Sequence, residues 1–230
     1  MAFNPADFTV EEPKSIPVVL LLDTSSSMQG ESIIALNNAV ELMITKFKEA
    51  ETLETFIKLS IITFGNEDVQ LHTPLKEVST IEFEKLNPGG MTPMGKALRM
   101  AKEMIEDKVI FKGRDYRPAV ILLSDGAPND DWEKSLDNFV GNGRSSKCDR
   151  LAVAIGDDAD KVVLEKFISG NENSLFLAED ASKIMDVFKK ITMSVSMRTK
   201  SVNKNAPINI DESLSNGDID INDLDSFKFD

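Results

Sequence analysis

Residues 18–27 read VVLLLDTSSS, five apolar residues followed at once by an acid and a run of hydroxyl side chains. An unbroken apolar run of this length is typical of a parallel strand that is covered on both faces. From Glu31 to Lys48 apolar residues then recur at spacings of three and four, which is one face of an amphipathic helix. The stretch therefore predicts a buried strand, a polar loop and a helix.

The same alternation of strand and helix patterns continues along the chain. Two β-rich segments at 56–64 and 69–78 are predicted to form a hairpin, and Thr92 is predicted to cap a helix that opens at Pro93. Further strands are expected at 118–123, 150–155 and 174–177, and further helices at 131–140, 161–167 and from about 184 to 200. The pattern predicts an α/β fold: a doubly wound, Rossmann-like, mostly parallel sheet with one antiparallel edge strand and helices on both faces.

The composition of the chain suggests three regions. We expect an N-terminal extension at 1–15, one folded domain at 16–200 and an acidic C-terminal tail at 201–230. From residue 203 onward the tail holds seven acids against Lys204 and Lys228, and its apolar residues follow no helix or strand period. It is therefore predicted to be flexible, or loosely docked on a partner or on the domain itself.

The charge of the chain narrows the class of partner. A net charge of -13 and a pI near 4.6 disfavour binding to nucleic acid or to anionic lipid, because both need clustered lysines and arginines. The longest apolar run is too short to span a bilayer, so we expect a cytoplasmic protein without a membrane segment. The single cysteine, Cys148, excludes an intramolecular disulfide and is predicted to be a buried strand residue.

Hydroxyl and carboxylate side chains follow the predicted strands where a doubly wound sheet binds its ligands. Asp23, Ser25 and Ser27 stand at alternate positions after the first strand, so their side chains can face one point. Asp125 follows the strand at 118–123, and Thr92 stands in a loop that can reach the same rim. An all-oxygen set suits a small hard cation better than zinc, so Mg²⁺ is predicted, with Mn²⁺ and Ca²⁺ also open.

Taken together, these segments resemble the metal-ion-dependent adhesion site of the von Willebrand factor type A domains. The three motifs of that family occur here in order: the first strand with residues 23–27, then residues 90–93, then residues 122–126. The resemblance covers about residues 15–200. Residues 123–131 and 193–202 are most similar to the bacterial cytoplasmic branch associated with tellurium resistance. That narrower resemblance implies a role in a bacterial stress system.

The resemblance also implies a fold, a site and a function. The fold is that of a von Willebrand factor type A domain, with Ser25, Ser27 and Thr92 as direct metal ligands and Asp23 and Asp125 acting partly through water. A carboxylate of a partner protein would complete the coordination of the ion. We therefore expect a metal-dependent protein-binding module, not an enzyme.

Two alternatives remain open at this stage. A Mg²⁺-dependent phosphatase of the haloacid-dehalogenase type would use Asp23 as its nucleophile, and residues 156–160 resemble its last acidic motif. That chemistry needs a second aspartate two residues later as general acid and base, where this chain has Ser25. The other alternative is a structural α/β module in which the hydroxyls serve only as turn and capping groups. A serine hydrolase has no support, because the single histidine, His72, lies in a predicted edge strand.

Overall fold

The apolar run at 18–22 forms the middle of the central strand, β1 (Lys14–Thr24). β1 pairs in parallel with β2 (Thr55–Gly65) on one side and with β4 (Ala119–Ser124) on the other. The computed structural model describes residues 13–65, 68–169 and 174–206. The predictions for the tail beyond residue 206 and for most of the N-terminal extension therefore lie outside the described residues.

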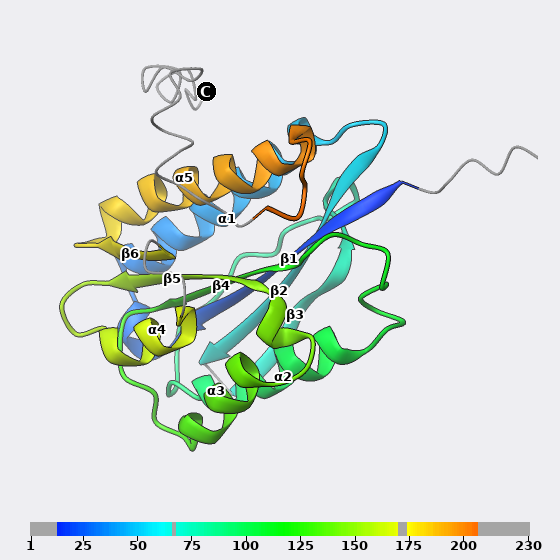
Figure 1. Ribbon diagram of the computed structural model, residues 1–230. Coiled ribbons are helices and arrows are strands. Elements are labelled where there is room, and N and C mark those ends of the chain that lie inside the picture. Colours follow the sequence, from blue (N-terminus) through cyan, green and yellow to red (C-terminus); the bar gives the residue numbers. More distant parts are fainter. Residues whose placement is uncertain (1–12, 66–67, 170–173, 207–230) are drawn as a thin grey trace, which may run out of the picture.

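The sheet has six strands in the order β3-β2-β1-β4-β5-β6 (Figure 1). β5 (Asp149–Ile155) and β6 (Leu175–Ala178) extend it in parallel beyond β4. At the other edge, β3 (Asp68–Glu77) pairs antiparallel with β2. This mixed sheet with one antiparallel edge pair confirms the predicted fold class.

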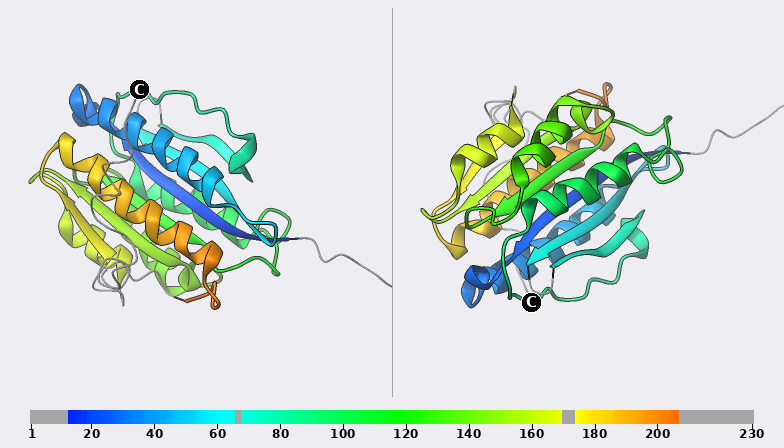
Figure 2. Two further views of the ribbon diagram at one scale, coloured as in Figure 1. Left: turned by 90° about the horizontal axis from the view of Figure 1, so that it is seen from above. Right: turned by 90° about the horizontal axis from the view of Figure 1, so that it is seen from below.

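Helices cover both faces of the sheet (Figures 1 and 2). One face carries α1 (Glu31–Ala50) and α5 (Ala181–Lys200); the other carries α2 (Met94–Glu106), α3 (Trp132–Gly141) and α4 (Lys161–Ile168). Because side chains alternate along a strand, Val18, Leu20 and Leu22 pack under α1 and α5 while Val19 and Leu21 pack on the opposite side. Every residue in this part of β1 is apolar because both faces of the strand are buried. Short 3-10 turns lie at Ser26–Met28, Val78–Thr80 and Ser145–Lys147.

Two local predictions were wrong. Thr92 does not cap α2, because the helix starts at Met94 and Pro93 occupies the cap position. Instead, the backbone amides of Gly95 and Lys96 each donate a hydrogen bond to the Asp130 carboxylate at 2.9 Å. A carboxylate from a neighbouring loop thus accepts the hydrogen bonds of the first helical amides, which a local capping residue would otherwise accept. Cys148 is buried as expected, but it lies in the turn before β5 and not in the strand.

No helix among the described residues is both long enough and apolar enough to cross a membrane.

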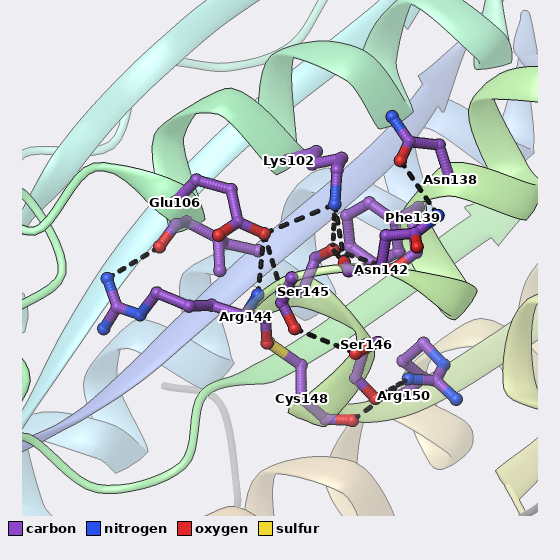
Figure 3. Close-up of polar contacts among 12 residues, drawn as sticks. Lys102, Glu106, Asn138, Phe139, Asn142, Arg144, Ser145, Ser146, Cys148 and Arg150 are labelled. Carbon is purple, nitrogen blue, oxygen red and sulfur yellow. Dashed lines mark hydrogen bonds and ion pairs between the residues drawn. The ribbon is translucent and has the colours of Figure 1, made fainter.

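A polar network joins the end of α2 to the connection between α3 and β5 (Figure 3). The Glu106 carboxylate accepts hydrogen bonds from the Arg144 amide at 2.7 Å, the Ser145 amide at 3.3 Å and Lys102 Nζ at 3.3 Å. Gly143 faces this carboxylate, and a Cβ at Gly143 would lie 2.1 Å from Glu106 Oε1. Glu106 therefore holds an otherwise irregular connection against the helix.

Glu106→Gln is expected to lower stability at neutral pH and to flatten its dependence on pH in the acid range. Burial alone would raise the pKa of Glu106, but the bonds from Ser145, Arg144 and Lys102 outweigh it and hold the pKa below the ordinary 4.5. A lowered folded-state pKa adds stability above the unfolded value, and this stability is lost as the pH falls through the folded value. Urea unfolding at a series of pH values between roughly 3 and 7 measures the effect. Glu103→Gln, an exposed carboxyl on the same helix, is the control; equal pH profiles for both variants would contradict the prediction.

Candidate metal site

The predicted site residues meet at a switch point of the sheet. β1 and β4 are neighbours, with Leu22 beside Leu123, so the loops that follow them begin side by side (Figure 1). From β1 the chain goes to β2 and β3 on one side and returns to β4 on the other, which makes the gap between β1 and β4 the place where strand order reverses. Loops at such a point diverge and leave a crevice for a ligand.

Four of the five predicted residues form one connected hydrogen-bond network. The hydroxyls of Ser25 and Ser27 lie 2.9 Å apart, and Ser27 Oγ donates to Asp125 Oδ1 at 2.8 Å. Asp23 Oδ1 accepts a bond from the Ser25 amide at 2.9 Å. Asp23 and Ser25 are buried, whereas Ser27 is exposed and Asp125 is partly exposed. The network therefore extends from buried residues at the end of β1 to side chains that contact solvent.

The spacing of these oxygens suits a small octahedral cation. Ligands at 2.0–2.1 Å from Mg²⁺ on adjacent corners of an octahedron are about 2.9 Å from each other. The contacts from Ser25 to Ser27 and from Ser27 to Asp125 measure 2.9 and 2.8 Å. The described residues hold no group of three or more His, Cys, Asp or Glu side chains that could bind a metal. A metal at this rim would therefore rely on the hydroxyls.

Among the residues that the structure describes, no basic side chain is paired with either of the two carboxylates. Burial raises the pKa of Asp23 to about 6, although hydrogen bonds from Ser124 and Ser25 lower it, and the nearby Asp125 raises it further. Burial likewise raises the pKa of Asp125, and Asp158 adds to the rise. Within the described part of the chain, no lysine or arginine forms an ion pair with Asp23 or Asp125. A bound divalent cation would supply the missing positive charge.

The loop of Thr92 is fastened to the same rim through its backbone. The Ser26 amide donates to the Gly90 carbonyl at 3.1 Å, and the Ser26 hydroxyl donates to it at 3.0 Å. On the other side, the Thr92 amide donates to Asn129 Oδ1 at 3.0 Å. No hydrogen bond in the described structure joins the Thr92 hydroxyl to the other four residues. The structure thus brings the loop of Thr92 to the rim through its backbone.

Several supporting residues were not identified from the sequence. Ser124 Oγ donates to Asp23 Oδ2 at 2.5 Å, so both carboxylate oxygens of Asp23 are held. Asn129 and Asp130 tie the Thr92 loop and α2 to the loop after β4. Ser124 directly precedes Asp125 and Asn129 follows it four residues later, so their positions were a usable signal. Their individual partners depend on how three separate loops pack.

The chain is similar to known proteins in its sequence pattern and in its fold. The family model of the von Willebrand factor type A domain matches residues 18–190. No protein in the curated set matches the chain.

Solved structures give the same fold at low sequence identity. Proximal thread matrix protein 1 from the mussel byssus is 19% identical, with a TM-score of 0.62, over 79% of this chain and 48% of that one. A second structure of that protein, described as having a zinc-occupied MIDAS motif, is 17% identical, with a TM-score of 0.60, over 79% and 48%. The pilus adhesin SpaC from Lactobacillus rhamnosus GG is 15% identical, with a TM-score of 0.62, over 79% and 30%. The chain thus spans about half or less of these proteins, and such low identities show the fold alone.

Proposed function

The chain belongs to the von Willebrand factor type A domain family, and from that premise we propose that it is a metal-dependent protein-binding module. In this proposal Asp23, Ser25, Ser27, Thr92 and Asp125 hold one Mg²⁺ at the rim of the sheet. Ser25, Ser27 and Thr92 would be direct ligands, with Asp23 and Asp125 acting partly through water. A carboxylate from a partner protein would take the remaining position.

The observation that carries the proposal is the row of oxygens from Ser25 through Ser27 to Asp125. The spacings of 2.9 and 2.8 Å are hydrogen-bond lengths that adjacent ligands of a small cation can also have, and the row leads outward to the exposed Ser27 and the partly exposed Asp125. A turn or capping role would explain each hydroxyl separately. It would not explain why the loop after β1 places two hydroxyls next to Asp23 and next to Asp125 of the loop after β4, when neither carboxylate has a basic partner among the described residues.

The metal is proposed to be Mg²⁺, with Mn²⁺ and Ca²⁺ as close competitors. Carboxylate and hydroxyl oxygens are the ligands that these hard cations prefer. One solved relative is described with zinc in the corresponding motif, so zinc belongs in any comparison of affinities. When bound, the ion supplies a local positive charge that a carboxylate can approach.

The proposed partner chemistry follows from the charge of the chain. A protein with a net charge of -13 repels acidic groups unless a cation reverses the local potential. Only two of the five proposed ligands are anionic, so their negative charge does not exceed that of a divalent ion. That a solved structure of the same fold is a pilus adhesin agrees with a binding role.

The relaxation rate of water protons near bound Mn²⁺ tests whether the ion keeps a coordination position that a partner carboxylate can fill. The probes are a peptide carrying one glutamate and the same peptide carrying glutamine. We expect the glutamate peptide to displace exchangeable water and lower the relaxation enhancement, while the glutamine peptide leaves it unchanged. Thr92→Ala should weaken this response. Equal effects of the two peptides would reject a carboxylate-completed site.

We expect no phosphatase activity. Asp23 is buried, both of its oxygens accept hydrogen bonds, and Ser25 cannot act as the general acid and base of the rival mechanism. Hydrolysis of a generic phosphate ester in the presence of Mg²⁺ measures this. Turnover that disappears in Asp23→Asn would establish the phosphatase alternative instead.

We also propose that the protein acts in the cytoplasm, in a bacterial system of the tellurium-resistance type. The support is sequence similarity at 123–131 and 193–202. Deletion of the gene in its host should then increase sensitivity to tellurite, and complementation should restore growth. Unchanged tellurite sensitivity would remove this assignment without affecting the proposed metal site.

A further inference from the structure

A second charged surface lies at the rim opposite the candidate metal site, where β1 and β4 begin. A cavity of about 420 Å³ opens there between Pro17 and Pro118. Four basic side chains line it: Lys112, Arg117, Arg144 and Lys147. We call it the basic pocket. Such a cluster is unexpected in a chain with a net charge of -13.

The acidic groups near the basic pocket do not neutralise all of this charge. Asp115 also lines the pocket, but its side chain is only 4% exposed. Its carboxylate accepts a hydrogen bond from the Ser15 amide, and its Oδ2 atom lies 4.0 Å from Lys58 Nζ. Arg117 pairs with the buried Asp149 at 3.2 Å.

Arg144 and Lys147 supply charge that no described carboxylate offsets. The Arg144 guanidinium donates to the Ile105 carbonyl at 2.9 Å, and neither side chain forms an ion pair among the described residues. Lys147 is exposed. The mouth of the basic pocket therefore keeps a positive potential.

An apolar groove adjoins the basic pocket. Lys112 also lines a second cavity, of about 580 Å³, between α2 and the edge strand β3. Leu71, Val109 and Ile110 line this groove with exposed fractions of 43%, 85% and 39%. Glu103 and Asp107 also line the groove, so the positive charge is concentrated at the basic pocket and the groove offers apolar area. The two cavities together fit a ligand that carries acids in one part and apolar side chains in another.

The chain itself carries a segment of this chemistry next to the pocket. Asn205 lines the basic pocket and accepts a hydrogen bond from the Arg117 amide at 2.8 Å, and residues 207–230 begin two positions later in the sequence. They contain seven acids and one lysine. Their later part alternates acids with apolar side chains: Ile219, Ile221, Leu224, Phe227 and Phe229. Ten residues of extended chain span about 33 Å, so the segment can cover both cavities.

We propose that residues 207–230 dock on this surface of their own chain, with acids at the basic pocket and apolar side chains in the adjoining groove. Covalent attachment gives the segment an effective concentration in the millimolar range, so modest contacts are sufficient. The contacts are mainly exposed charge pairs, which salt screens strongly. The surface is thereby covered by an internal ligand at the end of the domain away from the candidate metal site.

Paramagnetic relaxation in the full chain tests the proposal. A nitroxide is attached through Ser226→Cys; Cys148 does not compete, because it is buried and burial raises the pKa of its thiol to about 12. We expect broadening of the amides of Lys112, Arg144 and Lys147, and loss of the broadening at about 1 M salt. Lys147→Glu should reduce the docked population roughly two- to fivefold. Lys161→Glu, the same charge change at an exposed residue of α4, should leave the docked population unchanged.

Every other outcome would overturn the proposal. No broadening at the basic pocket, or broadening only elsewhere, would show that the segment does not dock there. Broadening that vanishes when labelled chain is diluted with unlabelled chain would identify a second copy as the occupant. Broadening that is insensitive to both salt and Lys147→Glu would exclude the charge complementarity on which the proposal depends.

Discussion

Replacing Ser25 and Ser27 together by alanine is expected to weaken binding of Mg²⁺ or Mn²⁺ by at least about 100-fold. The two hydroxyls lie 2.9 Å apart, and Ser27 also holds Asp125 at 2.8 Å, so their removal takes away two proposed ligands and frees a third. Calorimetry with Mg²⁺ and electron paramagnetic resonance with Mn²⁺ measure the change. The wild-type chain should bind one ion.

The control for this experiment is another acid on the same rim. Asp157→Ala removes an exposed carboxylate from the loop after β5 and should change the affinity little. The double serine variant should stay folded, because Ser27 is exposed and neither hydroxyl belongs to the apolar core. It should lose the thermal stabilisation that Mg²⁺ gives the wild type, about 2.7 kcal/mol at a concentration 100 times the dissociation constant. Unchanged metal affinity in the double variant would show that the site is wrongly assigned.

Gly65→Ala is expected to damage both the fold and the metal site. Gly65 ends β2 beside Thr24, and its φ of +151° is one that other residues rarely adopt. A Cβ would lie 2.3 Å from the Thr24 carbonyl carbon and 2.5 Å from the Ser25 amide. Backbone atoms must shift to admit it, which costs about 1–3 kcal/mol or more. The shift would displace the loop that carries Ser25 and Ser27.

Urea unfolding and Mn²⁺ titration of Gly65→Ala measure the two effects. The matched control is Gly126→Ala, because Gly126 follows Asp125 on the same rim and a Cβ there would meet nothing within 4 Å. We expect that control to bind metal and unfold like the wild type. A Gly65→Ala variant with wild-type stability and affinity would contradict the close packing of β2 against the metal loop.

The sequence predicted the sheet and helices well because burial on both faces leaves a strong pattern. A strand such as β1 must be apolar at every position, and α1 must be apolar at spacings of three and four. The hairpin of β2 and β3 was also predicted correctly, because polar residues with Gly65 separate two β-rich segments. These are local signals, and they need no knowledge of distant contacts.

The contacts that hold the rim were less predictable. Asp130 accepts hydrogen bonds from the Gly95 and Lys96 amides at the start of α2, 35 and 34 residues away in the sequence, so the prediction of Thr92 as the cap was wrong. The constraint at Gly65 arises from the neighbouring strand and not from its own turn. Such long-range contacts follow from packing, and single residues do not reveal them.

Affinity capture from the native lysate, performed once with Mg²⁺ and once with EDTA, measures whether a partner protein binds only through the metal. We expect the wild-type chain to retain a protein in Mg²⁺ and to release it in EDTA. Asp125→Ala and Thr92→Ala should fail to retain it, while Asp157→Ala should retain it fully. Replacing one glutamate or aspartate of that protein by its amide should abolish retention. A partner bound equally well in EDTA and by the Asp125→Ala variant would show that recognition uses another surface.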